Sequence, residues 1–399
     1  MLLSPYAPGS RPGYLAGRGQ QLEQVRRRSA RLAQLGRSGG PLLAFVGPRG
    51  LGKTSLLRQA ETEARQDGFL TTWVTGRDDR SVTAEISRSL SGELASRSLA
   101  QRARGLVERL DAVQVEVGLP GAKVGVELDT SSGPTSAPAQ PDLRSLLAEA
   151  GTTARGNDLG GLVVFVDELQ DARLEDRRSL LIALQELDAD HTGAPVAVVA
   201  AGLPSLYRGV PDAATFGERT DWVEIGLLGD VAVAEALREP AEALGVSWSD
   251  AAVVAAIDLA AGYPHKAQLV GDETWDAARP GVVGSVIEPG HVALAAERVE
   301  ERMARLFDSR LNRVTAEQRR LVAAMAEAAG GTDRAVARAD LAGLLEQAPR
   351  ALSRPRQELV DKGLIAPAGH GMLRFTIPGF SAYARRQLGD ASAGGDAGS

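Results

Sequence analysis

The amino-terminal half of the chain alternates between short apolar runs and longer stretches in which apolar residues recur at helical spacing. Continuous apolar runs at 42–46, 162–166 and 196–201 predict buried strands, whereas the leucines and valine of 20–35 predict a helix after an extended lead-in at 1–13. The other expected strands are 69–75 and 222–227, and the other expected helices are 53–67, 82–110, 143–153 and 174–187. Strands that alternate with helices predict a three-layer α/β fold, in which a parallel sheet is covered on both faces.

Two regions depart from this alternation. Between 113 and 128, valines alternate with polar residues on both sides of a glycine-containing turn, which predicts a hairpin, and a loop rich in Ser, Pro and Ala follows at 131–141. After Gly229 the strand pattern stops, and helices are expected at 231–244, 250–261, 264–278 and 291–313. The expected domains are an α/β core at 14–229 with an insertion at 112–141, a helical domain at 230–290, a linker helix with a small domain at 291–388, and a disordered tail at 389–399.

Composition narrows the class of protein. The chain has 399 residues, of which 44% are hydrophobic and 24% charged, and this balance is ordinary for a globular protein rather than a fibrous or disordered one. The charge sum of 45 − 51 = −6 provides no global positive field for nucleic acid or anionic membrane. Because the chain has no cysteine, disulfides and zinc-thiolate sites are excluded. No apolar run approaches the ~20 residues of a spanning helix, so a cytoplasmic protein without membrane contact is expected.

The strongest chemical motif follows the first apolar strand. It matches G-x-x-x-x-G-K-[ST] and reads Gly47, Pro48, Arg49, Gly50, Leu51, Gly52, Lys53, Thr54, with Ser55 next in the helix. Glycines let a loop wrap its backbone N–H groups around phosphates at the start of a helix. Lys53 is expected to contact the β- and γ-phosphates, and the Thr54 hydroxyl is suited to ligate Mg²⁺. The motif therefore predicts a nucleoside triphosphate site.

A second motif supplies the acids that such a site needs. The apolar strand at 162–166 ends in Asp167 and Glu168, which are the candidates for holding Mg²⁺ and for activating the attacking water. Gln170 and Asp171 either orient water or begin a solvated helix. The next strand, 196–201, ends without the Asn or Thr that often senses the γ-phosphate, so either Ser205 substitutes or the sensor is degenerate and hydrolysis is slow.

These motifs resemble those of the AAA+ and STAND ATPases, and in particular the ATPases grouped near the Orc1/Cdc6 initiators. The resemblance implies ATP or ADP with Mg²⁺ as ligands, and adenine contacts from Leu15, Gly17 and Arg18 before the first helix. It also implies a helical lid with a Gly-x-Pro module, which assigns Pro264 to the nucleotide. His265 and Lys266 stand where an AAA+ arginine is expected, which favours a STAND-like switch. Arg219 is a candidate γ-phosphate-sensing or finger arginine, with a surface salt bridge as the alternative.

The carboxyl-terminal domain is predicted to be a winged helix. Thr315 can cap the first of three helices, and two strands at 364–366 and 372–377 flank a wing-like turn. Residues 315–387 carry 11 − 7 = +4 charges, against −10 for the rest, which is typical of a local nucleic-acid footprint. The candidate DNA contacts are Arg350, Arg354, Arg356 and Arg374. Pro355 lies within the expected recognition helix at 349–362, which must kink or start late.

Together these features predict an ATP-dependent switch of low turnover. Its winged helix is expected to be the output and to contact double-stranded DNA, as in a regulator or an initiator-like protein. Two alternatives stay open. One is a signalling or defence ATPase that forms homo-oligomers or binds protein partners, because winged helices also serve as internal switches. The other is a scaffold that has lost hydrolysis.

Overall fold

The computed structural model describes residues 2–97, 104–116, 142–189, 194–348 and 350–393. The chain divides into two compact units. One comprises Met1–Arg18, Gly47–Ser55 and Ile225–Ser399, and the other comprises Gly19–Val46 and Leu56–Glu224. Within the described ranges, no helix is both long and apolar enough to cross a bilayer.

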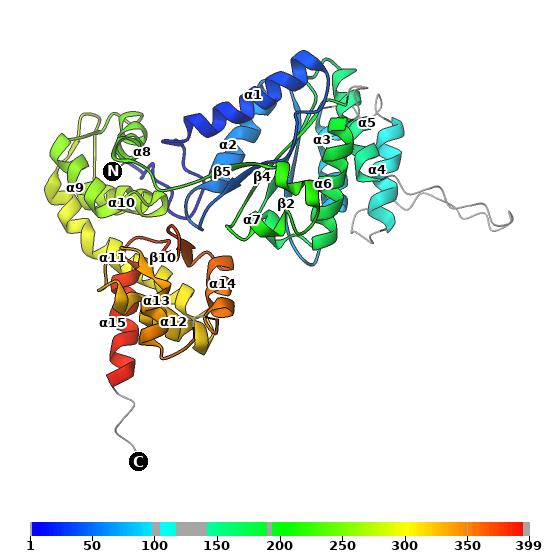
Figure 1. Cartoon of the computed structure of the whole chain (residues 1–399). Helices are drawn as coiled ribbons and strands as arrows, with labels where there is room; N and C mark the ends of the chain where they lie inside the picture. The colour runs from blue at the N-terminus through cyan, green and yellow to red at the C-terminus, as the bar shows by residue number, and fades with distance from the viewer. Residues whose placement is uncertain (1, 98–103, 117–141, 190–193, 349, 394–399) are drawn as a thin grey trace. The chain divides into compact units, whose positions relative to one another are not determined.

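A parallel sheet of five strands, in the order β2-β3-β4-β1-β5, is the centre of the second unit (Figure 1). The strands are β1 Leu43–Val46, β2 Leu70–Thr75, β3 Leu162–Asp167, β4 Val196–Gly202 and β5 Asp221–Glu224. In register, Val46 lies beside both Gly202 and Glu224, and Val166 lies beside Ala200. The strands therefore end together at one carboxyl edge. Strand β4 separates β1 from β3, so the phosphate-loop strand and the acidic strand are not neighbours.

Helices cover both faces of the sheet, which confirms the three-layer α/β prediction. The helices and short 3₁₀ turns of this region are α1 Gly19–Leu35, α2 Lys53–Gln66, α3 Val82–Ser96, α4 Arg104–Glu116, α5 Leu143–Arg155, η1 Leu169–Asp171, α6 Leu174–Ala189, α7 Leu206–Gly209 and η2 Thr215–Arg219. On one face, alternate strand residues such as Leu70 and Val164 share a core with α3, α4, α5 and α6. On the other face, Arg58 of α2 stacks on Trp73, and the turn after α1 packs Gly39 on Ala197.

The predicted hairpin is wrong at its first strand. Residues 113–116 are the last turn of α4, while 117–128, the rest of the expected hairpin, and the loop at 131–141 lie outside the described residues. Leu106 and Leu110 are buried four positions apart and fix α4 as a helix that packs on α3 and α5. Four residues of alternating pattern are too few to distinguish a strand from the end of such a helix.

The other unit contains a helical bundle with α8 Asp230–Glu242, α9 Asp250–Ala260 and α10 Pro264–Ala278, as predicted, plus two short strands, β6 Ser247–Trp248 and β7 Val286–Ile287, that were not. The described part of the lead-in, 2–13, packs on this bundle. Tyr6 is buried, its rings meet Trp248 and Trp275 edge to face, and its hydroxyl donates to Leu237 O at 2.5 Å and accepts from Trp248 Nε1 at 2.9 Å.

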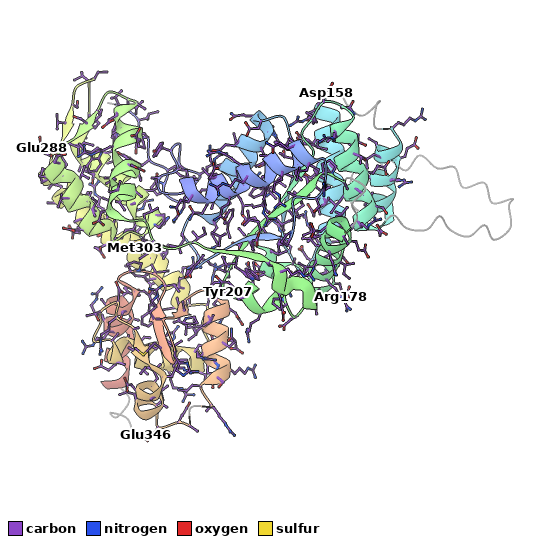
Figure 2. All side chains as sticks on the ribbon, turned by 45° about the horizontal axis from the view of Figure 1, so that its top comes forward. Asp158, Arg178, Tyr207, Glu288, Met303 and Glu346 are labelled. Atoms are coloured by element: carbon purple, nitrogen blue, oxygen red, sulfur yellow. The ribbon has the colours of Figure 1, made fainter. Side chains whose placement is uncertain are left out.

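The remaining helices and strands of this unit are α11 Pro289–Leu311, α12 Ala316–Ala328, β8 Val336–Ala337, α13 Arg338–Leu344, α14 Ser353–Asp361, β9 Ile365–Pro367, β10 Met372–Phe375 and α15 Phe380–Ala393. Figure 2 labels Glu288, which caps the start of α11, and Met303, which is one of the buried residues of this helix. The antiparallel sheet β8-β10-β9 and the helices α12, α13 and α14 have the layout of a winged helix, in which β8 lies between α12 and α13. Helix α14 starts late, at Ser353, which places Pro355 in its first turn, where a proline is tolerated. The first strand β8 and the last helix α15 were not predicted.

We expect Tyr6→Phe to lower the free energy of unfolding by about 1–3 kcal/mol, because it leaves the buried Leu237 carbonyl and Trp248 N–H without their partner. Thermal and urea unfolding measure this loss. Tyr14→Phe is the matched control, since Tyr14 is 38% exposed and its loss should cost less than about 0.5 kcal/mol. Equal stabilities of the two variants would contradict the anchoring role of Tyr6.

Candidate functional site

The loop between β1 and α2 has the backbone that phosphate binding requires. Gly50 and Gly52 both adopt φ of +82°, a left-handed conformation that favours glycine. Because Gly47 follows Val46 directly, the loop leaves the sheet at its carboxyl edge. The loop then enters α2 at Lys53, so its N–H groups are at the positive end of a helix dipole.

Three side chains donate hydrogen bonds to the carbonyl groups of this loop. Lys53 Nζ donates to Gly47 O and to Pro48 O, both at 2.7 Å. The Tyr263 hydroxyl donates to Arg49 O at 3.2 Å, and a guanidinium N–H of Arg18 donates to Leu51 O at 3.2 Å. With its carbonyls held in this way, the loop presents N–H groups, the donors that a phosphate needs.

Arg18 and Tyr263 are buried side chains that stabilise the loop conformation. Arg18 is 5% exposed, it also donates to Gly226 O at 2.7 Å, and burial lowers the pKa of its guanidinium. Tyr263 is 1% exposed, burial raises its pKa to about 12, and a Cβ added at Gly50 would lie 1.8 Å from its hydroxyl. Any side chain at position 50 would therefore clash with Tyr263, and only glycine leaves room for its ring.

The residues next to Arg18 and Tyr263 in the sequence include the other predicted nucleotide contacts. Gly17 has φ of +66°, and an added Cβ would meet Ala232 Cβ at 2.5 Å, so only glycine permits this approach to α8. Leu15 is half-buried, and Pro264 is the first residue of α10. Burial first, and then the positive charges of Arg302 and Arg310, lower the pKa of His265, which keeps this imidazole neutral to lower pH than usual.

Thr54 and Ser55 lie in the first turn of α2. Thr54 is exposed and Ser55 is half-buried, whereas Lys53 is buried, with an exposed fraction of 7%. The Thr54 hydroxyl is an oxygen donor of the kind that Mg²⁺ prefers.

At the carboxyl edge of the sheet, β3 ends with Asp167, which is 6% exposed, and Glu168 follows in a left-handed conformation with φ of +48°. A positive φ is rare for a residue with a side chain and is often retained at functional sites. Gln170 Nε2 donates to Glu168 Oε2 at 2.5 Å, and Gln170 Oε1 accepts from Leu203 N at 2.9 Å. The amide thus ties the glutamate to the end of β4.

This bridge explains why β4 ends without an Asn or Thr. An added Cβ at Gly202 would lie 2.4 Å from Gln170 Oε1, so the amide of Gln170 fills the space next to the strand tip. From the sequence, Gln170 was expected either to orient water or to begin a solvated helix. Nothing in the sequence indicated that it contacts position 203. The contact joins residues 33 positions apart, and no local pattern indicates it.

Arg219 lies away from this edge. It directly precedes Thr220 and β5, whose first residue pairs with Leu43 at the start of β1, so Arg219 is at the amino edge of the sheet. It is exposed and borders a cavity of about 40 Å³ lined also by Leu42 and Asp188. No hydrogen bond or ion pair of the Arg219 side chain occurs among the described residues, and the salt-bridge alternative therefore gains no support.

The four candidate DNA-contacting arginines occupy different settings. Arg374 is exposed on β10, between the buried Leu373 and Phe375, and Arg350 is exposed in the turn before α14. Arg354 is exposed and forms an ion pair with Glu358 at 2.8 Å. Arg356 is only partly exposed and lines a pocket between α13, α14 and β10.

Comparison with known families agrees with these observations. Residues 14–199 match a family model described as an AAA ATPase domain, and residues 304–384 match one described as a domain of unknown function (DUF8462). Comparison with curated protein sequences gives no match. Residues 14–199 therefore form an AAA ATPase domain, and its phosphate loop makes it a P-loop ATPase of the AAA+ class.

Solved structures share this fold along nearly the whole chain. The Walker-type ATPase PABY2304 of Pyrococcus abyssi superposes with a TM-score of 0.60 at 16% identity, covering 95% of this chain and 98% of that one. The ORC2 protein of Aeropyrum pernix, solved as ADPNP and ADP complexes, superposes with a TM-score of 0.55 at 13% identity, covering 97% of each chain. The chain thus shares the fold of these two structures, as expected from its motifs.

We expect Gln170→Ala to lower the kcat of ATP hydrolysis about tenfold and to leave the KM for ATP unchanged. Without the amide, Glu168 loses the hydrogen bond that orients its carboxylate. Steady-state kinetics separates the two constants. Gln185→Ala, on the surface of α6, is the control, and a raised KM with unchanged kcat would contradict the positioning role of Gln170.

Proposed function

We propose that the chain is an ATP- and Mg²⁺-dependent molecular switch that hydrolyses ATP slowly and transmits its nucleotide state to the winged helix. The observation that carries this proposal is the loop at 47–52, whose carbonyls are engaged by Lys53, Tyr263 and Arg18. A loop held in this way is preorganised for phosphate and loses little conformational entropy on binding.

Each residue of the site has a role in this proposal. The Lys53 ammonium exchanges its two carbonyl partners for the β- and γ-phosphate oxygens, and the N–H groups of positions 49–55 bind the phosphate chain. Thr54 and Asp167 supply oxygen ligands for Mg²⁺, directly or through water. Mg²⁺ would neutralise charge on the phosphates. No cluster of three or more His, Cys, Asp or Glu occurs in the described ranges, and a nucleotide-bound Mg²⁺ does not require one, because phosphates and water complete its shell.

Hydrolysis is assigned to Glu168 as the general base, with Gln170 as the residue that positions it. Gln170 Nε2 donates to one carboxylate oxygen of Glu168 and so orients the group that would accept a proton from water. Because the same amide accepts from Leu203 N, a shift at the end of β4 would move the base. This dependence supports low turnover in the absence of an activating signal.

The switch itself is assigned to Tyr263. It connects the helical bundle to the phosphate loop through one hydrogen bond to Arg49 O, which is weak enough at 3.2 Å to change with nucleotide state. Pro264, which follows it, fixes the start of α10. A displacement of the tyrosine would thus be transmitted to α10 and to α11, which packs on it.

For the output, we propose contact with double-stranded DNA through Arg350, Arg354 and Arg374. The net charge of +4 over residues 315–387 supports this partner, and the three guanidinium groups are exposed. The alternative is a STAND-type signalling or defence ATPase that assembles with copies of itself or with protein partners. The position of Arg219 favours this alternative, because an exposed arginine at the amino edge would be available to phosphates bound by a neighbouring copy.

We expect calorimetry with ATP and Mg²⁺ to give saturable binding that Lys53→Ala weakens at least tenfold, because a charge-assisted contact to phosphate is worth about 1.5–3 kcal/mol. Glu168→Gln should retain this affinity and lower kcat about 100-fold or more, as expected for a lost general base. Glu175→Gln, an exposed glutamate on α6, is the control that should change neither. Absence of nucleotide binding by the unmodified chain would refute the proposed function.

We expect Arg374→Ala and Arg350→Ala each to weaken binding of duplex DNA and to reduce the slope of log K against log salt by about 1, since each removes one phosphate contact. Fluorescence anisotropy at several salt concentrations measures both quantities. Arg104→Ala, an exposed arginine of α4 that is paired with Glu108, should leave binding unchanged.

Unaltered DNA binding in both variants would contradict the proposed interface. The signalling alternative is then tested by light scattering with ADP and with a non-hydrolysable ATP analogue. A larger assembly only with the analogue, lost in Arg219→Ala, supports that alternative, and an unchanged monomer contradicts it.

A further inference from the structure

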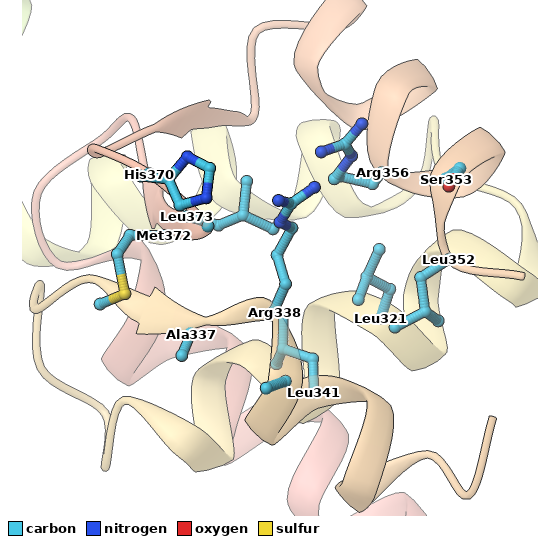
Figure 3. Close-up of a pocket in the computed structure, with 12 residues that line it drawn as sticks. Leu321, Ala337, Arg338, Leu341, Leu352, Ser353, Arg356, His370, Met372 and Leu373 are labelled. Atoms are coloured by element: carbon cyan, nitrogen blue, oxygen red, sulfur yellow. The ribbon is translucent and has the colours of Figure 1, made fainter. Parts of the chain in front are cut away.

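The winged helix contains a pocket of about 450 Å³ between its helices and its wing. It is lined by residues of α12, β8, α13, α14 and β10, namely Leu321, Ala337, Arg338, Ala339, Leu341, Leu352, Ser353, Arg356, His370, Gly371, Met372 and Leu373. Figure 3 shows Arg338 extending from the start of α13 toward Arg356 of α14, with His370 across from them. The volume falls in the range of about 300–1,000 Å³ that is typical of small-molecule sites.

The charge in this pocket is one-sided. Two guanidinium groups and an imidazole line it, and the described residues that form its wall include no Asp or Glu. Other arginines of the domain are engaged: Arg334 donates to Ala329 O, Arg354 pairs with Glu358, and Arg385 pairs with Glu327. For Arg338, in contrast, the part of the chain that the structure describes provides neither an ion pair nor a side-chain hydrogen bond.

The rest of the wall is apolar. Leu321, Leu341, Leu352 and Leu373 are each at most 7% exposed and form the inner side of the pocket, and Met372 adds a polarisable side chain. In Figure 3, Leu321, Leu341 and Leu352 lie together on the side away from His370. An inorganic ion would use only the charged side of the pocket and leave this apolar surface without a partner. A ligand that combines a charged group with an apolar body would match both parts.

We propose that this pocket binds a small organic anion, with one carboxylate or similar head group between Arg338 and Arg356 and an apolar body against the leucines. A carboxylate accepts two parallel N–H donors from a guanidinium, which fixes its orientation. The site joins the start of α14 to the turn before β10, which are the recognition helix and the wing of the domain. A bound anion would therefore fix the relative position of these two elements. This inference goes beyond the proposed ATPase switch, and it does not depend on nucleotide binding.

The test uses 2-naphthoate as the probe and the neutral 2-naphthylmethanol as its matched analogue, titrated by calorimetry into the full chain. Naphthoate is expected to bind at one site, at least tenfold more tightly than the alcohol, because only the anion gains charge-assisted hydrogen bonds. Arg338→Gln should weaken naphthoate about tenfold and leave the alcohol unchanged. Arg374→Gln, which removes an exposed arginine outside the pocket, should change neither.

A second variant tests the apolar part. Ala339→Phe adds a ring at an exposed position on the rim and is expected to weaken both probes, with a thermal midpoint close to that of the unmodified chain. The inference is overturned if naphthoate does not saturate, if Arg338→Gln and Arg374→Gln weaken it equally, or if duplex DNA binds while neither probe does. In the last case Arg338 serves the nucleic-acid interface, and the pocket has no ligand of its own.

Discussion

The structure depends on how the carbonyl groups of one short loop are satisfied. A loop that offers its N–H groups to phosphates must turn its carbonyl groups elsewhere, and buried carbonyls need donors. Lys53, Arg18 and Tyr263 provide these donors for Gly47, Pro48, Arg49 and Leu51. The three side chains come from the helix that follows the loop, from the segment before the first helix and from the helical bundle. Support from distant segments is what makes the loop conformation responsive to the rest of its unit.

The acidic motif depends on a comparable contact. Glu168 keeps a left-handed backbone, which costs free energy unless its surroundings enforce it. Gln170 contributes to this by bonding both the carboxylate and the backbone of Leu203. Gly202 leaves room for that amide at the tip of β4. The residue that orients the base is thus recruited from the segment after β3, and β4 contributes only backbone.

In the winged helix, charge is divided between an outer surface and a pocket. Arg350, Arg354 and Arg374 face solvent, where salt screens them and where a polyanion is the natural partner. Arg338 and Arg356 line an apolar hollow, where both guanidinium groups are available to orient a single anion. The sequence places all five among the basic residues of the same domain, and only the structure shows that two of them line the pocket.

The sequence by itself predicted the alternation of strands and helices in the α/β core, the phosphate-loop motif, the acidic strand end and the winged-helix layout, because periodicity, glycine spacing and capping residues act over a few neighbouring positions. It missed the short strands β6, β7 and β8 and the helix α15. It was wrong for residues 113–116, where the packing of α4 on α3 and α5 decided between helix and strand. Only the tertiary structure placed Arg219 at the amino edge, Gln170 between Glu168 and β4, and Tyr263 against the loop. These placements join residues as far as 214 positions apart, and they follow from which segments share a core rather than from any local pattern.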